Sequence, residues 1–172
     1  METFVNELQS ATDFVRQLFA DRNINLDYSP QSVKHLDALF DKEFIRGELT
    51  NKQGTFAEYQ GLIMTGVSGY VAQVILQNTT NAQLTFEDDD ENWFVNFSVE
   101  ADNGRRIIPG HLVLKRAYTG NEKELYSYVM DAIGYFTEPT TTNKALAIFT
   151  QIAGVKQESE SNDKDKLWWK IW

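Results

Sequence analysis

Residues 61–77 read GLIMTGVSGYVAQVILQ, the longest stretch of the chain that is mostly apolar. Apolar residues cover more than half of the circumference of a helix built from it, and a helix that is apolar on most sides is buried. Gly66, Gly69 and Gln73 form a narrow stripe of small or polar residues. Because glycine costs about 1 kcal/mol inside a helix, close approach of another backbone is the expected compensation. The sequence therefore predicts a central helix over about 56–77 whose glycine stripe faces another helix or the sheet.

Two amphipathic helices are predicted before this stretch. The first lies within residues 1–20, where apolar residues recur at helical spacing. The second begins at Ser29 and Pro30, because serine is a good N-cap and proline suits the first helical position. Its apolar stripe consists of Val33, Leu36, Phe40 and Phe44, with Asp37, Asp41 and Lys42 off that stripe and Gly47 as the expected stop.

After residue 80 the hydrophobic period changes from about 3.6 to 2, which is typical of strands. Leu84 and Phe86 alternate with polar residues, and a second alternating run covers 93–99. A turn at 102–104 and a third strand over about 106–115, broken near Pro109, follow. Short connections between three strands predict an antiparallel meander.

The last predicted elements are helical. A capping-box pattern at 121–124 precedes a helix through Phe136, and a short helix is expected over about 144–152. We expect one α+β domain at 1–155, a flexible linker at 156–166 and an aromatic tail at 167–172. The fold class is α+β, with N-terminal helices, a three-stranded antiparallel meander and C-terminal helices packed on the sheet. The expected shared core consists of Val71, Ile75, Trp93, Phe97 and Leu112.

Composition limits the classes of function. The 172 residues include 25 acidic and 16 basic ones, a formal net charge of -9, and no cysteine. So acidic a chain repels phosphate backbones, which argues against nucleic-acid binding. The absence of cysteine excludes disulfides and Cys-ligated zinc and fits a cytoplasmic location. No cofactor is expected.

The densest charge is the run 87–91, which contains Asp88, Asp89 and Asp90. Its spacing lacks the glycine and the bidentate glutamate of an EF-hand loop, so no metal site is predicted. A solvated hairpin tip is the main interpretation, and an electrostatic contact for a basic partner is the alternative.

No catalytic residues are predicted. The chain has two histidines, His35 and His111, and their spacing ties neither to the other. If a ligand pocket exists, we expect it near Tyr28, Tyr70, Gln73 and His111. Gln73 is otherwise interpreted as a hydrogen-bonded core residue.

The most unusual segment is 167–172, with Leu167, Trp168, Trp169, Ile171 and Trp172. Exposed aromatic groups usually indicate an interaction site. Docking back onto the domain, capture by a protein partner and contact with a membrane interface are the three hypotheses. Six residues with few positive charges would bind a membrane only weakly.

Two motifs resemble a group of uncharacterised bacterial domains. They are LDYSPQSV at 26–33, which opens a helix, and GYVAQVI at 69–75. In that group the second motif usually reads Gly-x-Tyr-x-Gly-Glu-Val and precedes a strand with tryptophan. Here Ala72 and Gln73 replace Gly-Glu, so no role of that carboxylate is carried over. The resemblance spans about 26–136 and implies a fold without an agreed activity.

The sequence thus favours a non-enzymatic, cytoplasmic protein-binding module, an immunity-like or regulatory partner of a basic protein. The immunity-like interpretation rests on size and charge only. A small-molecule-binding domain or small enzyme with a pocket near Tyr70 and Gln73 is one alternative. A peripheral membrane protein held by its tryptophans is the other.

Overall fold

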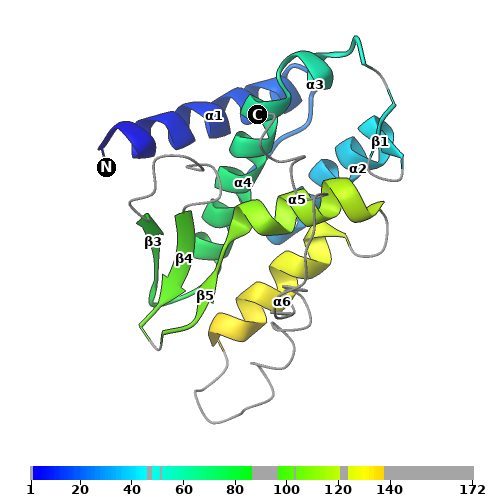
Figure 1. The fold of residues 1–172 in the computed structure, drawn as a ribbon. Helices are drawn as coiled ribbons and strands as arrows, with labels where there is room; N and C mark the ends of the chain where they lie inside the picture. Colours follow the sequence, from blue (N-terminus) through cyan, green and yellow to red (C-terminus); the bar gives the residue numbers. More distant parts are fainter. Residues whose placement is uncertain are drawn as a thin grey trace, which may run out of the picture. The chain divides into compact units, whose positions relative to one another are not determined.

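The computed structural model describes residues 2–45, 48–50, 52–86, 97–102, 104–120 and 124–137. The chain divides into two units, 1–140 and 141–172, and every described residue belongs to the first. Figure 1 shows its helices and strands in chain order. Their bounds are α1 Glu2–Ala20, the 3-10 helix η1 Pro30–Ser32, α2 Val33–Glu43, β1 Phe44–Ile45, β2 Glu48–Leu49, α3 Thr55–Glu58, α4 Gln60–Gln77, β3 Ala82–Phe86, β4 Phe97–Ala101, β5 Arg106–Ile107, α5 Pro109–Thr119 and α6 Leu125–Thr137.

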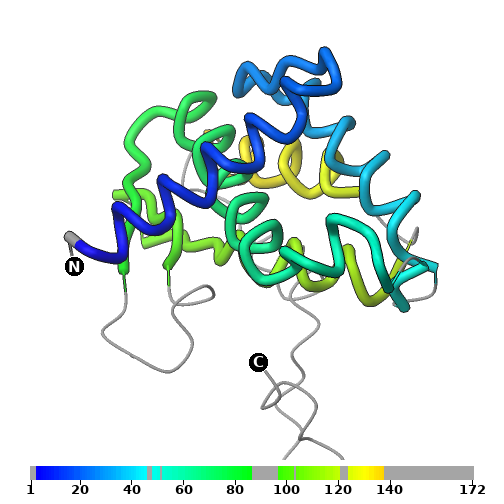
Figure 2. The backbone as a smooth tube through the Cα atoms, turned by 90° about the horizontal axis from the view of Figure 1, so that it is seen from above, coloured from blue at the N-terminus to red at the C-terminus, as the bar shows by residue number. Residues whose placement is uncertain are grey.

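Helix α4 is the centre of the described unit, as predicted. Most of its residues from Ile63 to Ile75 are buried, and α1 lies alongside it in both views (Figures 1 and 2). A Cβ built on Gly66 would lie 2.1 Å from the carbonyl oxygen of Ala11, and one on Gly69 would lie 2.2 Å from Oγ1 of Thr12. The glycine stripe therefore faces α1, and the missing side chains allow the two backbones to approach.

The sheet is the predicted antiparallel meander, in the order β3-β4-β5. Strand β3 pairs with β4 from Ala82 opposite Ala101 to Phe86 opposite Phe97. Phe97 and Val99 are buried, and α4 and α5 pack against β4. The sheet thus has one apolar face that the helices cover, which confirms the α+β class.

The third strand is much shorter than predicted. The strand expected over 106–115 ends at Ile107, and Pro109 begins α5, which continues to Thr119. The prediction was wrong because Pro109 was interpreted as a break in a strand, although proline also suits the first turn of a helix. The buried residues of α5 have helical spacing and not the period of two that a strand requires. They include Leu112, Val113, Arg116 and Ala117.

Smaller boundaries also differ from the prediction. Ser29 caps the 3-10 helix η1, which Pro30 begins, and α2 begins only at Val33. Helix α2 ends at Glu43, and Phe44 belongs to the short strand β1, which pairs with β2. The predicted helix over 56–77 is divided at Tyr59 into α3 and α4. Helix boundaries depend on tertiary packing as well as on the apolar stripe, and here Phe40, Phe44 and Phe56 form a cluster of three rings.

Helix α6 confirms the predicted helix through Phe136 and packs against α2, α4 and α5. Of the expected core residues, Val71, Ile75, Phe97 and Leu112 are buried. Trp93, the acidic run 87–91, the capping pattern at 121–123, the short helix at 144–152, the linker and the tail lie outside the described residues.

Candidate functional site

The loop between α1 and η1 brings together two of the residues predicted to line a pocket. The rings of Tyr28 and Tyr70 stack with their centroids 4.9 Å apart. Tyr28 has φ of 62°, a left-handed conformation that costs a non-glycine residue about 1–2 kcal/mol. Its backbone is held on both sides: the N–H donates to Oη of Tyr70 at 2.8 Å, and Nδ2 of Asn78 donates to its carbonyl oxygen at 3.2 Å.

Tyr70 is fully buried, with 0% of its surface exposed. Its hydroxyl also lies 2.5 Å from Oγ of Ser32. Burial raises the pKa of Tyr70, and the hydrogen bonds with Ser32 and Tyr28 oppose this shift only in part. A neutral phenol in this position is a hydrogen-bond hub that fixes the turn before α2. It contributes no exposed polar group with which a ligand could be bound.

Gln73 and His111 occupy different environments. Gln73 is half-buried on α4, on the stripe of Gly66 and Gly69 that faces α1. His111 lies in the first turn of α5 and not on a strand, so its predicted secondary structure was wrong. Its side chain is exposed, yet partial desolvation and then the charge of Arg106 lower the pKa of His111 below its ordinary value.

One groove lies beside the tyrosine pair. It has a volume of about 320 Å³ and is lined by α1 and the loop after it. The lining residues are Asp13, Arg16, Gln17, Ala20, Ile24, Asn25 and Leu26. Arg16 connects the groove to the loop, because its guanidinium lies 4.8 Å from the centroid of the Tyr28 ring. None of the four residues predicted for a pocket lines this groove.

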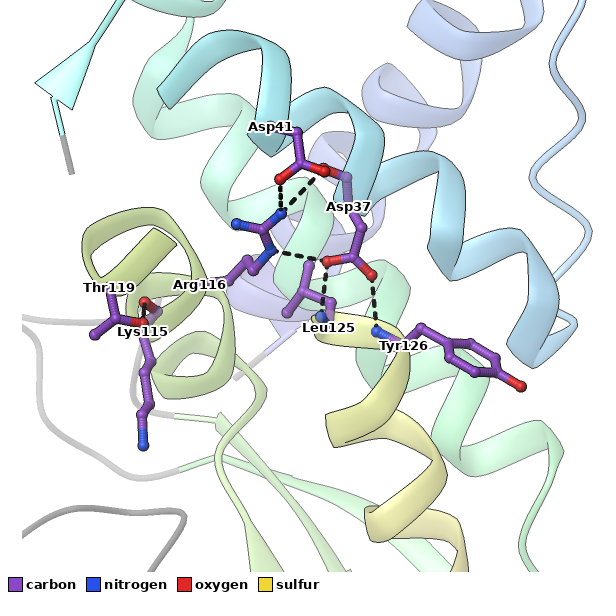
Figure 3. A network of polar contacts seen from close by, with 7 residues as sticks. All are labelled: Asp37, Asp41, Lys115, Arg116, Thr119, Leu125 and Tyr126. Carbon is purple, nitrogen blue, oxygen red and sulfur yellow. Dashed lines mark hydrogen bonds and ion pairs between the residues drawn. The ribbon is translucent and has the colours of Figure 1, made fainter. Parts of the chain in front are cut away.

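The densest polar network of the described residues joins α2, α5 and α6 (Figure 3). Nε of Arg116 donates to Oδ1 of Asp37 at 2.9 Å, and the exposed fractions of the two side chains are 1% and 7%. The same guanidinium donates to Asp41, which is half-exposed. Although burial alone lowers the pKa of Arg116, its hydrogen bonds with Asp37 and Asp41 raise that pKa above the ordinary value.

The carboxylate of Asp37 also holds the start of α6. It accepts the backbone N–H of Leu125 at 2.7 Å and that of Tyr126 at 2.9 Å. A carboxylate at a helix N-terminus satisfies unpaired donors and favours the helix dipole. Asp37 accepts from three donors, and Arg116 donates to two carboxylates. The charged groups of the network are thus hydrogen-bonded to one another, and its role is structural.

The pairing of Asp37 with Arg116 was not predicted, although the sequence carries a signal for Asp37. Asp37 lies four residues after Val33 and three before Phe40, so it borders the apolar stripe of α2. Arg116 had no comparable signal, since residues 106–115 were interpreted as a strand. Among the described residues, no group of three or more His, Asp and Glu side chains could hold a metal ion.

Two of the exposed apolar side chains of the described unit offer a different kind of site. Tyr59 precedes α4 as its N-cap, Leu62 lies in the first turn of α4, and each is 40% exposed. Leu62 follows Tyr59 by three residues. The ring of Phe14 on α1 lies 5.6 Å from the ring of Tyr59. We call Phe14, Tyr59 and Leu62 the α1–α4 surface.

Comparison with protein-family models, with curated proteins and with solved structures gives no match. No helix in the described part of the chain is long and apolar enough to cross a membrane. Of the predicted contact residues, Asp88, Asp89, Asp90 and the tail 167–172 lie outside the described residues, and their roles stay predictions.

Proposed function

We propose that this chain is a non-enzymatic protein-binding module in the bacterial cytoplasm, an immunity-like or regulatory partner of a basic protein. The α1–α4 surface is the observation that carries the proposal. Tyr59 and Leu62 are each 40% exposed at the start of α4, and the ring of Tyr59 lies beside that of Phe14 on α1. Scattered apolar residues are common on protein surfaces, but adjacent ones mark contact sites more often.

The residue types of the α1–α4 surface are those found at the centre of protein–protein interfaces. Tyrosine is enriched among the residues that dominate binding energy, and truncation of such an anchor typically costs about 2 kcal/mol or more. The hydroxyl of Tyr59 is held by Glu58, whose hydrogen bond and negative charge raise the pKa of Tyr59. The phenol therefore stays neutral and presents its ring beside Phe14 at neutral pH.

Charge supports a basic partner. A chain with a net charge of -9 attracts a basic protein at long range and accelerates its association. Screening by salt weakens this attraction, because the Debye length falls to about 3 Å at 1 M salt. The acidic residues Asp88, Asp89 and Asp90 and the tryptophans of 167–172 are further proposed contacts.

Affinity capture with the purified full-length chain tests the proposal. We expect it to retain a basic protein at low salt and to release it as salt is raised. The variant Tyr59→Ser/Leu62→Ser should retain much less. Met130→Ser is the matched control, because Met130 is 41% exposed on α6 and is not part of the α1–α4 surface.

Two further variants separate the proposed contacts. A chain that ends at Gln157 lacks the tryptophans, and an unchanged set of partners would remove the tail from the proposal. Replacement of Asp88, Asp89 and Asp90 by Asn should weaken capture mainly at low salt. Equal capture by the wild type and by Tyr59→Ser/Leu62→Ser would contradict the role of the α1–α4 surface.

A further inference from the structure

Strand β3 is at the edge of its sheet. The order β3-β4-β5 leaves one side of β3 without a neighbour among the described strands. A strand of five residues, Ala82–Phe86, is long enough to pair with an added strand. An unpaired edge is a template for pairing with another chain unless a proline, a bulge or a charge blocks it. Strand β3 contains no proline or charge, and its register with β4 has no bulge.

The hydrogen-bond pattern shows which residues of β3 face the open edge. The N–H of Asp102 donates to the carbonyl oxygen of Asn81 at 3.2 Å, so this pair is hydrogen-bonded. Antiparallel pairs alternate between hydrogen-bonded and non-hydrogen-bonded. Along the register of β3 and β4, the residues of β3 in non-hydrogen-bonded pairs are therefore Ala82, Leu84 and Phe86.

The pairing of β4 with β5 independently identifies the same residues of β3 as facing the open edge. The N–H of Ala101 donates to the carbonyl oxygen of Arg105 at 2.9 Å, so Ala101 directs its backbone groups toward β5. Successive residues of a strand direct these groups to opposite sides. Glu100 and Ser98 hence face β3, in agreement with the first assignment, and three residues of β3 present their N–H and C=O groups at the edge.

The side chains at this edge are apolar and incompletely covered. Leu84 and Phe86 lie opposite Val99 and Phe97, on the same face of the sheet as these two buried residues. Unlike them, Leu84 and Phe86 are only half-buried. A strand added beside β3 would place its own alternate side chains over both, and so extend the apolar face by one strand.

We propose that the open edge of β3 binds an extended basic segment of a partner protein by strand addition. The net charge of -9 favours a basic occupant, and the chain continues from Phe86 directly into the acidic run 87–91. The same charge disfavours a second copy of this chain, because two acidic molecules repel each other. This surface is different from the α1–α4 surface, so it adds an interaction to the proposed function and can fail separately.

A pair of variants at Leu84 tests the inference. Leu84→Pro removes an outward N–H and leaves the hydrogen bonds between β3 and β4 in place, a position where an edge strand tolerates proline. Leu84→Ala removes most of the same side chain and keeps the N–H. The probe is a fluorescein-labelled octapeptide of alternating lysine and valine, and binding is measured by anisotropy with the full-length chain. Circular dichroism verifies that both variants are folded.

We expect Leu84→Pro to bind the peptide about tenfold more weakly than Leu84→Ala does, since one donor and its strand geometry are lost. The same peptide with N-methylated valines should bind the wild type at least about tenfold more weakly, because it keeps the charge and loses its donors. This second comparison requires no variant and remains valid if Leu84→Pro does not fold.

Three results would overturn the inference. The first is equal affinity for the two peptides, which would show attraction by charge alone. The second is no measurable binding of the lysine–valine peptide. The third is a dimer in sedimentation equilibrium with slow exchange of the amide protons of Ala82, Leu84 and Phe86, which would make a second copy the occupant. None of them depends on Tyr59 or Leu62, so the proposed function is tested separately.

Discussion

The buried carboxylate of Asp37 and the buried guanidinium of Arg116 connect α2 to α5 through a hydrogen bond of 2.9 Å. The other donors to Asp37 are backbone N–H groups of α6. One side chain thus fixes the relative positions of three helices that are distant in sequence. This network lies between helices α2, α5 and α6 and involves neither β3 nor the α1–α4 surface.

Loss of Asp37 should destabilise the fold strongly. Asp37→Ala removes the buried carboxylate partner of Arg116 and takes the side-chain acceptor away from two N–H groups of α6. Breaking a buried pair in this way typically costs about 3–5 kcal/mol, and we expect urea unfolding to show a loss of this size. Asp41→Ala is the control, with an expected loss of about 1 kcal/mol or less. Equal losses in the two variants would contradict the role given to Asp37.

The contact between α1 and α4 should not tolerate a methyl group at Gly66. A Cβ there would meet the backbone oxygen of Ala11 at 2.1 Å and Cγ2 of Val15 at 2.6 Å. Gly66→Ala therefore requires a shift of a helix, and we expect a loss of about 1–3 kcal/mol in thermal or urea unfolding. Gly134→Ala in α6 has open space at its Cβ and should be neutral or stabilise by up to about 1 kcal/mol.

The hydroxyl of Tyr70 should matter more than that of Tyr28. Tyr70→Phe removes the acceptor of the Tyr28 N–H and the partner of Ser32. A buried donor left unsatisfied costs about 1–3 kcal/mol, and the left-handed turn at Tyr28 loses one of its two backbone restraints. Tyr28→Phe keeps the ring stack and should change the free energy of unfolding by less than about 0.5 kcal/mol. The opposite order of the two variants would disprove this account of the turn.

The stability contributed by His111 should decrease in acid. Partial desolvation and the charge of Arg106 hold the pKa of the exposed His111 below its ordinary 6.5, so the unfolded chain takes up the proton first as the pH falls. The contribution is complete above the unfolded pKa of about 6.5 and is lost as the pH falls from there through the folded pKa. His111→Gln should remove this part of the decline in urea unfolding.

Proton NMR titration of the His111 imidazole provides the control. Arg106→Gln removes one of the two causes of the shift and should raise the pKa of His111. An unchanged pKa of His111 in Arg106→Gln would assign the whole shift to partial desolvation. A pKa of His111 above 6.5 in the wild-type chain would contradict the direction of the shift.

Local patterns were enough to predict the main elements of the fold. The glycine stripe of α4, the N-cap at Ser29 and the alternation of Leu84 and Phe86 each depend on near neighbours in sequence. The third strand was wrong because proline and glycine are compatible with a strand break and with the first turn of a helix. Only the packing of α5 against β4 and α4 decides between them.

The candidate sites were harder to predict for a physical reason. The pairing of Asp37 with Arg116 spans 79 positions in sequence, and a charged residue beside an apolar stripe is usually solvated. Tyr28 and Tyr70 were grouped by the sequence and do stack, but the partners of the buried Tyr70 hydroxyl, Tyr28 and Ser32, lie about 40 positions away in sequence. The edge position of β3 is a property of the assembled sheet, which hydrophobic alternation does not encode.

The central claim is that the α1–α4 surface binds a basic partner, and its most direct test is a dissociation constant. Calorimetry at one salt concentration should compare the captured partner's affinity for the wild type, for Tyr59→Ser/Leu62→Ser and for Met130→Ser. The account predicts at least about tenfold weaker binding for the double variant, since an anchor residue is worth about 2 kcal/mol, and no change for Met130→Ser. Equal dissociation constants for all three proteins would contradict it.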